Sequence, residues 1–255
     1  MQEKEMRVET ADGEMRTFVV HPDGSGPFPV AVLYMDGVGY REQIKKNARR
    51  FAGHGYYVVA PDLYYRAGEM SFDPSKLMGE NPDPAMREKM MQAASSTQPA
   101  KIVEDTKAAL KAISADSAAA KGPKVCVGYC MGARMALHAA SAMPNEFVAA
   151  AGIHPGALIN DKPDSPHHDL KNVRAELYFA FAEVDRTATA ENVDQFRREM
   201  ESGGVRGEVE RIASVTHGYA MADMPVYDSA ASERHFEKVL ELWDRNLGHS
   251  PALRR

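Results

Sequence analysis

Residues 125–132 read Val-Cys-Val-Gly-Tyr-Cys-Met-Gly, and an apolar stretch with helical spacing follows at 133–140. A β-branched run that turns sharply into a helix at Gly-x-Cys-x-Gly predicts a strained strand–turn–helix element. Glycine is needed on either side because a side chain there would collide with the backbone of the turn. The turn would expose Cys130 at the carboxyl end of a sheet and at a helix N-terminus, whose dipole favours a thiolate. This segment therefore predicts a nucleophilic cysteine on an α/β scaffold.

The rest of the chain alternates between strand and helix patterns. Asp12-Gly13 is a hairpin signal between two N-terminal strands, at 5–10 and 14–20. Further strands are predicted at 29–35, 56–60, 124–128, 147–153, 175–182 and 207–212, and helices at 41–52, 84–93, 100–115, 189–202 and 228–247. An opening hairpin followed by β–α repeats predicts one α/β-hydrolase domain over residues 1–255. Its mostly parallel central sheet would be covered by helices on both faces.

One long excursion interrupts this alternation at residues 66–99. It contains five methionines and four prolines, namely Met70, Met78, Met86, Met90, Met91, Pro74, Pro82, Pro84 and Pro99. One interpretation is an irregular surface connection that holds one short helix. The other is a mobile wall or lid over the carboxyl edge of the sheet, where adaptable methionine side chains suit varied apolar groups. The sequence leaves both open.

Composition excludes several classes of partner. A net charge of −5 gives no reason to expect nucleic acid or an anionic membrane as partner. No apolar run approaches the roughly 18 residues of a membrane span, and the first five residues lack the basic and apolar regions of a signal peptide. The two cysteines, Cys126 and Cys130, would lie inside a strand and beyond its end, a poor arrangement for a disulfide. We therefore expect a cytoplasmic protein, a monomer or a small homo-oligomer, that acts on a small molecule.

A nucleophilic cysteine needs a base, and the base needs an orienting acid. In elbow folds the order along the chain is nucleophile, acid, histidine. Asp185 and His217 each follow a predicted strand, so both would lie at the same sheet edge as Cys130. Glu183 remains an alternative acid. His154 also follows a strand but precedes Asp185, so we expect it to line the substrate pocket rather than to act as the base.

The oxyanion that forms during acyl transfer needs two N–H donors. One is predicted to be the backbone N–H of Met131, and the other an N–H of the loop 35–39, at Gly37. The glycines of this loop permit the unusual backbone that aims an N–H inward. Asp36 is either a turn residue or a carboxylate that holds the thiol protonated until substrate arrives.

Together these residues resemble the dienelactone hydrolase family. The likeness covers almost the whole chain and rests on 35–39, 60–64, the elbow 128–132, Asp185 and Thr216-His217-Gly218. Cysteine in the elbow sets this family apart from serine hydrolases. The resemblance implies a Cys130–His217–Asp185 triad. It also implies hydrolysis of an ester or lactone through a thioester acyl-enzyme, without metal or cofactor.

The chain departs from the family at several positions, and two of them concern the substrate pocket. Family members usually carry Glu where this chain has Asp36, and there the carboxylate interacts with the resting thiol. The dienelactone enzymes hold a substrate carboxylate with two arginines; Arg87 matches one, but Met221 stands where the other would follow the histidine. Loss of a bidentate donor predicts a pocket that prefers uncharged esters or lactones. The residues expected to line this pocket are Asp36, Arg87, His154 and Met221.

Two other classes of protein compete with this interpretation. A class I glutamine amidotransferase also has a cysteine elbow, but it needs His-x-Glu near the C-terminal end, and here Gly218-Tyr219 follow His217. A non-catalytic binding protein with a hydrolase fold would keep the pocket without the chemistry. The candidate triad favours an enzyme over this binding protein, although sequence alone gives no geometry.

Overall fold

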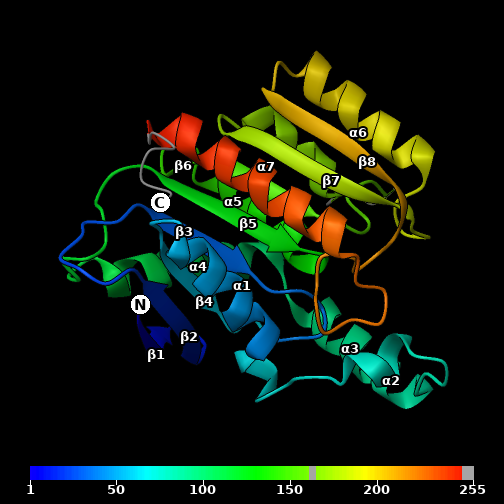
Figure 1. The fold of residues 1–255 in the computed structure, drawn as a ribbon, viewed down its shortest axis with the longest axis horizontal. Helices are drawn as coiled ribbons and strands as arrows, with labels where there is room; N and C mark the ends of the chain where they lie inside the picture. Colours follow the sequence, from blue (N-terminus) through cyan, green and yellow to red (C-terminus); the bar gives the residue numbers. More distant parts are fainter. Residues whose placement is uncertain (161–164, 249–255) are drawn as a thin grey trace.

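In the computed structural model, which describes residues 1–160 and 165–248, eight strands form one sheet (Figure 1). They are β1 (Gln2–Thr10), β2 (Gly13–His21), β3 (Val30–Tyr34), β4 (Tyr57–Pro61), β5 (Lys124–Tyr129), β6 (Phe147–Ile153), β7 (Glu176–Val184) and β8 (Gly207–Thr216). The order across the sheet is β1-β2-β4-β3-β5-β6-β7-β8. β1 pairs with β2 and β2 with β4 in antiparallel fashion, and every other neighbouring pair is parallel. The prediction of a mostly parallel sheet after an opening hairpin is confirmed.

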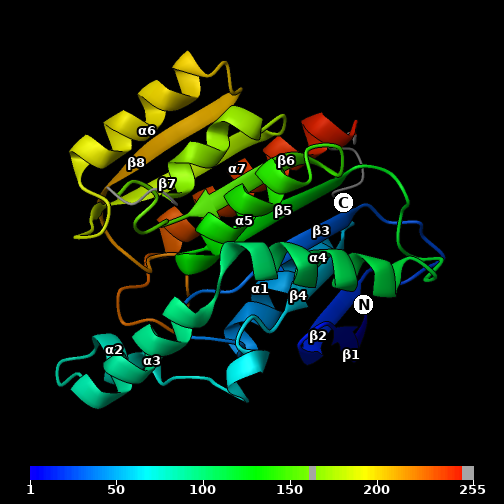
Figure 2. The same cartoon turned by 180° about the vertical axis from the view of Figure 1, so that it is seen from behind.

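Helices cover both faces of this sheet, as the sequence predicts. They are α1 (Glu42–Gly53), α2 (Pro74–Met78), α3 (Pro84–Ser96), α4 (Pro99–Ile113), α5 (Met131–Ala142), α6 (Ala190–Ser202) and α7 (Ser229–Leu247), with 3₁₀ turns η1 (Tyr65–Ala67) and η2 (Pro166–Asn172). α1 and α7 lie on the face toward the viewer in Figure 1, and α4 and α5 lie on the opposite face (Figure 2). α1 meets α7 at an aromatic contact, where the rings of Phe51 and Trp243 are 4.7 Å apart. None of the helices in the described part of the chain is long and apolar enough to cross a membrane.

The central strands are apolar throughout because both of their faces are covered. Every residue of β3 and of β4 is buried, and only the first residue of β5 is partly exposed. Alternation between apolar and polar residues is typical of a sheet with one wet face, and it is absent here. A strand of this kind ends where the chain leaves the core, which places the polar residues that follow at the carboxyl edge.

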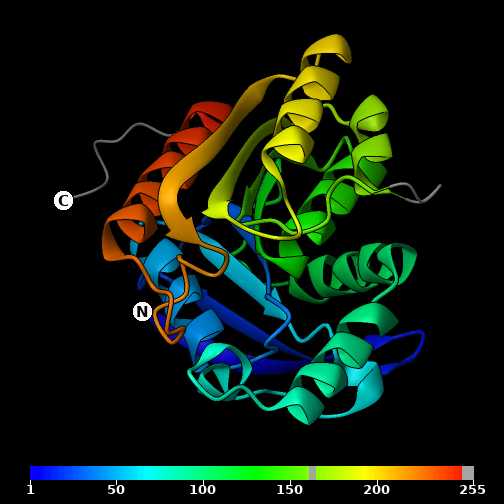
Figure 3. The same ribbon diagram turned by 90° about the vertical axis from the view of Figure 1, so that its right-hand side faces the viewer.

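The excursion at 66–99 contains two helices rather than the single short helix predicted. α3 begins where expected, with Pro84 at its first turn and Asp83 accepting hydrogen bonds from two backbone N–H groups. α2 begins in the same way, at Pro74 after the capping Asp73, but it has only five residues, too few for periodicity to reveal. Both helices lie beyond the ends of the strands, in the lower part of Figure 3.

Two strands run further than the sequence patterns indicate. β7 continues to Val184 and β8 to Thr216, and these two residues are paired across an irregularity in the register. Ser214 in β8 has φ of 62°, which marks a bulge, and its N–H donates to Glu183. The bulge bends the end of β8 and interrupts its regular apolar pattern. For this reason the strand predicted from the sequence ends at residue 212, four residues before the observed end of β8. The extension fixes where the residues after Val184 and Thr216 leave the sheet.

Candidate active site

Cys130 occupies the sharp turn between β5 and α5, with φ of 51° and ψ of −112°. The two flanking glycines are needed for this turn. A Cβ on Gly128 would lie 1.9 Å from the carbonyl oxygen of Gly132, and a Cβ on Gly132 would lie 2.4 Å from that of Tyr34. The Cys130 N–H donates to the carbonyl of Ile153 at 3.0 Å, which ties the turn to the end of β6. The backbone strain predicted for the elbow is present and is held by neighbouring strands.

The structure brings Cys130, His217 and Asp185 into one chain of contacts. His217 Nε2 lies 3.0 Å from Cys130 Sγ, and His217 Nδ1 lies 2.6 Å from Asp185 Oδ2. His217 is 23% exposed, whereas Asp185 is 2% exposed. An imidazole between a thiol and a buried carboxylate is the arrangement that withdraws and returns a proton in acyl transfer.

Electrostatics favour the charged form of each of these three groups. Burial by itself would raise the pKa of the Cys130 thiol, but the charge of His217 and its hydrogen bond outweigh burial and lower it. Burial opposes an imidazolium at His217, yet the charge of Cys130 and the hydrogen bond that His217 Nδ1 donates to Asp185 raise the pKa of His217 well above the ordinary value. Asp185 has a lowered pKa because its contacts with His217 and Thr187 exceed the effect of burial. The pair Cys130–His217 therefore favours thiolate and imidazolium together.

Asp185, and not Glu183, faces the imidazole. Thr187 holds the second oxygen of Asp185 with its N–H and its hydroxyl, both at 2.7 Å. The side chain of Glu183 lies elsewhere, accepting from the Ser214 N–H at 2.8 Å and from Arg211 at 3.4 Å. Thr187 was not among the site residues predicted from the sequence. Its position two residues after an aspartate is the spacing of an Asx turn and would have been the signal.

The loop after β3 borders the cavity that holds the thiol. Gly37 lines the same cavity as Cys130, and its backbone hydrogen bond lowers the pKa of the thiol. Tyr64 donates to the Gly37 carbonyl at 2.9 Å and holds the loop in place. Met131 begins α5 directly after the nucleophile, so its N–H is one of the unpaired donors of the helix N-terminus. Gly37 and Met131 both line the cavity that holds Cys130.

Asp36 lines the site but engages a different partner from the one that the resemblance implies. Its two oxygens accept from Arg41 Nη1 at 2.6 Å and Nη2 at 3.0 Å, and one of them also accepts from the Val38 N–H. No hydrogen bond joins Asp36 to Cys130 in the described residues. Arg41 was not among the sequence-predicted site residues, because it stands at the start of a helix like an ordinary surface arginine.

A cavity of about 380 Å³ opens above the thiol. It is lined by Asp36, Gly37, Val38, Leu77, Met78, Arg87, Met90, Met91, Ala94, Cys130, Met131, Arg134, His154, Gly156, Ala157, Thr187, His217, Gly218 and Met224. α2 and α3 supply its apolar wall, so part of the excursion at 66–99 borders the cavity. Carbon and sulfur atoms thus cover most of the wall, and a few polar groups converge near Cys130.

Two arginines face this cavity without a counter-charge. Arg87 is exposed on α3, and Arg134 is partly buried on α5. Within the described residues neither makes an ion pair, and Arg134 Nε is buried with no hydrogen-bond partner. Arg134 was missed at the sequence level, although its position four residues after Cys130 puts it on the same side of the elbow helix as the nucleophile.

The expectation that Met221 lines the pocket is wrong. Met221 is fully buried, does not line the cavity, and its sulfur accepts from the Asn47 side chain of α1 at 3.7 Å. After His217 the chain makes a series of tight turns, with Met221 N–H donating to the Gly218 carbonyl at 3.0 Å. The turns direct Met221 into the core and Met224 toward the cavity. The loss of an arginine at 221 therefore says nothing about the charge of the substrate.

His154 lines the cavity as expected, and its surroundings keep it neutral. Burial, and then the charge of His217, lower the pKa of His154 well below the ordinary value. Its ring meets that of His217 edge-on at 5.1 Å, and neither of its nitrogens has a hydrogen-bond partner in the described residues. His217 already lies beside Cys130, so the neutral and fully buried His154 is not the partner of the thiol.

Cys126, the second thiol, lies in the core beneath the elbow. It is fully buried in β5, and its sulfur contacts the carbonyl of Ala136 at 3.8 Å. Burial raises its pKa, so it remains a protonated thiol. The two cysteines differ in burial and in ionisation, and only Cys130 has a base beside it.

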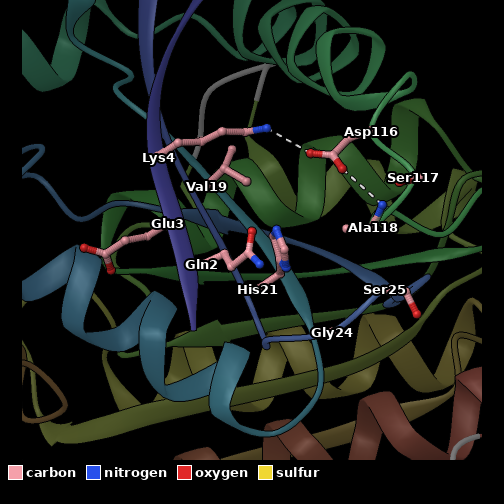
Figure 4. Close-up of a pocket in the computed structure, with 10 residues that line it drawn as sticks. All are labelled: Gln2, Glu3, Lys4, Val19, His21, Gly24, Ser25, Asp116, Ser117 and Ala118. Atoms are coloured by element: carbon pink, nitrogen blue, oxygen red, sulfur yellow. Dashed lines mark hydrogen bonds and ion pairs between the residues drawn. The ribbon is translucent and has the colours of Figure 1, made fainter.

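A second hollow of about 310 Å³ lies at the opposite edge of the sheet (Figure 4). Lys4 reaches across it to Asp116 at 2.9 Å, and the backbone of Ala118 donates to the same carboxylate. These charges neutralise one another, and no cysteine lines the hollow. Within the described residues no cluster of three or more His, Cys, Asp or Glu side chains is arranged to hold a metal ion. The elbow cavity is therefore the candidate active site.

The fold and the elbow define an α/β-hydrolase. The sequence profile of the dienelactone hydrolase family matches residues 15–247, so the chain belongs to that family. A Methylorubrum extorquens protein provisionally named carboxymethylenebutenolidase is 22% identical over 96% of this chain and 81% of its own length. A protein of the same provisional name from Escherichia coli K12 is 25% identical over 89% of this chain and 80% of its own.

A solved structure supports the fold independently of sequence. A provisionally assigned dienelactone hydrolase from Klebsiella pneumoniae superposes with a TM-score of 0.82 over 95% of this chain and 98% of its own length, at 17% identity. This likeness confirms the predicted α/β-hydrolase fold. The predicted family is confirmed by the profile match.

Proposed function

We propose that the protein hydrolyses a carboxylic ester or lactone through a thioester on Cys130. The contact chain Cys130–His217–Asp185 at a strained elbow carries this proposal. A protein that only binds its ligand has no need of a base 3.0 Å from a thiol, nor of a buried carboxylate behind that base. The family membership agrees with a hydrolase.

Acylation begins from the ion pair. The Cys130 thiolate attacks the ester carbonyl carbon, and the carbonyl oxygen becomes an oxyanion that the N–H groups of Met131 and Gly37 stabilise. The carbon–oxygen bond to the leaving group breaks as the tetrahedral intermediate collapses. The imidazolium of His217 gives its proton to the departing alkoxide, which leaves a thioester and a neutral imidazole.

Deacylation regenerates the ion pair. Neutral His217 takes a proton from a water molecule, and the resulting hydroxide attacks the thioester carbon. The same two N–H groups hold the second oxyanion. When the carbon–sulfur bond breaks, the acid is released and the thiolate faces an imidazolium again. Asp185 keeps the imidazole in the tautomer that both steps need.

The two unpaired arginines support a substrate with an anionic group near the scissile bond. The buried Nε of Arg134 is costly without a partner, and a carboxylate on the substrate would supply one, with the exposed Arg87 on the same cavity as a second cation. The name carboxymethylenebutenolidase, carried by the relatives, describes a lactone that bears such a carboxylate. This proposal replaces the expectation of an uncharged substrate, which depended on Met221 and on the methionines of 66–99.

Hydrolysis of p-nitrophenyl esters, followed by mass spectrometry of the rapidly quenched protein, tests this function. The expected result is turnover together with an acyl adduct on the peptide that contains Cys130. The adduct and the turnover should both be lost after treatment with iodoacetamide. Binding of esters without turnover or adduct would instead identify a non-catalytic binding protein.

A further inference from the structure

Arg41 joins the two loops that border the thiol. It uses all of its N–H donors: Nη1 and Nη2 bind Asp36, Nε and Nη2 bind Asp223, and Nη1 also reaches the Gly39 carbonyl. Asp36 belongs to the loop after β3, which carries Gly37. Asp223 belongs to the segment after β8, which begins with His217. One side chain therefore connects the oxyanion loop to the histidine loop.

The contact with Asp36 is nearly dry, whereas the contact with Asp223 is not. Asp36 is 1% exposed and Arg41 is 9% exposed, while Asp223 is 30% exposed. Water and salt therefore screen the Asp223 contact far more than the Asp36 contact. Removing one partner of a buried pair leaves an uncompensated charge in a place of low polarity. Arg41 is thus the group that compensates the negative charge of the buried Asp36 carboxylate.

This charge compensation matters because the Asp36 carboxylate affects the ionisation of the Cys130 thiol. Its negative charge raises the pKa of the Cys130 thiol, against the larger lowering effect of His217. A carboxylate released from Arg41 would regain its full charge beside the sulfur and could take up the thiol proton in a hydrogen bond. Both changes would favour the protonated thiol over the thiolate.

We infer that Arg41 is a positioning residue that holds the Asp36 carboxylate away from the nucleophile, so that Cys130 and His217 form a thiolate–imidazolium pair before substrate binds. This deepens the proposed function and rests on it. It differs from the interaction of the acidic residue with the resting thiol that the family resemblance implies. In the substrate-free protein Cys130 is already a thiolate, and the substrate does not need to displace Asp36 from it.

Other groups face the thiol and set its ionisation together with these two. They are His217 from the loop after β8, Tyr64 after β4, Arg87 on α3, Arg134 on α5, and His154 after β6. Tyr64 is neutral because burial raises its pKa, and His154 is neutral because burial lowers its pKa. Arg87 and Arg134 line the same cavity, and neither contacts Arg41 in the described residues. A change at Arg41 therefore acts on the thiol through Asp36 and through the loss of the Arg41 charge, and Arg41→Lys, which keeps the charge, separates the two effects.

The test is the pH titration of Cys130 in the substrate-free protein. Thiolate absorbance is measured against Cys130→Ala as the blank, and the rate of alkylation by iodoacetamide is measured in parallel. Wild type should hold a thiolate at neutral pH. Arg41→Met should raise the apparent pKa of the thiol by about 1 unit. A protonated thiol in wild type at neutral pH, or no shift in Arg41→Met, would overturn the inference.

A second substitution separates positioning from a general loss of structure. If Asp36 is what raises the thiol pKa in Arg41→Met, then adding Asp36→Asn should return the titration to the wild-type value. A merely structural role for Arg41 predicts no such rescue. Arg41→Lys, which keeps the charge but not the fork, should give a smaller shift in the same direction, and it serves if the methionine variant does not fold.

Asp223→Asn is the matched control, because it removes the other carboxylate that Arg41 binds and leaves Asp36 paired. Its thiol titration should stay near wild type, and a shift as large as that of Arg41→Met would contradict the inference. The readouts need no ester. A thiolate in a protein that hydrolyses no ester would therefore contradict the proposed function but not the role of Arg41. Ester hydrolysis by a protein whose resting thiol is protonated would contradict the role of Arg41 but not the proposed function.

Discussion

Val184 lies opposite Thr216 in the pairing of β7 with β8, and each stands directly before a residue of the candidate triad. The next residues, Asp185 and His217, leave the sheet at the same level, and the His217 N–H donates to the Val184 carbonyl at 3.1 Å. The contact between acid and base is thus set by strand register, and a slip in β8 would break it.

The two cysteines should respond differently to substitution. Cys130→Ala should abolish ester hydrolysis, a loss on the order of at least 10³-fold, because no other thiol faces His217. Cys126→Ala should keep most of the activity and lose some stability, since it opens a small cavity in the core. Cys130→Ser should be far slower than wild type, because the hydroxyl is much less acidic than the thiol. Comparable turnover from Cys130→Ala would exclude the mechanism.

The acid can be identified by comparing two conservative changes. Asp185→Asn should keep the fold and lower kcat by on the order of 10³–10⁴-fold, because the amide leaves the imidazole in the wrong tautomer. Glu183→Gln, which weakens only the contacts to Ser214 and Arg211, should change kcat by less than about 3-fold and cost a little thermal stability. Steady-state kinetics with circular dichroism would measure both. The opposite ranking would make Glu183 the acid.

Substrate charge should be sensed at Arg134. Between two esters that differ only in a free carboxylate, wild type should favour the anionic one. Arg134→Met should reduce that preference by about 1.5–3 kcal/mol, or roughly 10- to 150-fold in the ratio of kcat/KM. Met221→Arg is a contrasting variant: it should unfold or destabilise the protein rather than add to the preference, since Met221 lies in the core. A wild type that prefers the neutral ester would refute this prediction.

The pH profile should follow the coupled pair of Cys130 and His217. The thiolate is lost as pH falls through the lowered pKa of Cys130, so the acid limb of kcat/KM should lie below the ordinary thiol pKa of about 8.5. The imidazolium is lost as pH rises through the raised pKa of His217, so the alkaline limb should lie above about 6.5. Rates from acidic to alkaline pH would show a bell. A rate that keeps rising through the ordinary thiol pKa would mean that no thiolate is preformed.

Local chemistry made the fold and the elbow predictable. Gly128 and Gly132 predict a sharp turn at the cysteine, because a side chain at either position would collide with the backbone. Buried strands such as β3 and β4 are recognisable as continuous apolar runs. Asp185 and His217 were predictable because parallel strands bring the residues that follow them to one edge. Strand ends were less predictable, since the bulge at Ser214 is decided by pairing with β7 rather than by local sequence.

The side chains that no pattern revealed are those whose role depends on where a loop turns. The family resemblance predicted Met221 in the pocket, where a substrate-binding arginine would follow the histidine, but the turns after His217 direct Met221 into the core. In the sequence, Arg41 and Arg134 resemble ordinary surface arginines. In the fold, Arg41 meets two carboxylates whereas Arg134 meets none in the described residues, and only the tertiary structure shows this difference. Such facts belong to tertiary packing, which spacing along a chain does not encode.

Because Cys126 is buried, the number of thiols that react with a reagent reports the fraction of molecules that are folded. A thiol reagent in mild excess should take up one equivalent per native chain, at Cys130, and a second only from molecules that have opened. The first equivalent then counts active sites without a substrate, and the slow appearance of the second follows global opening through the centre of the sheet. A preparation that takes up two equivalents at once would be unfolded, whatever its residual turnover.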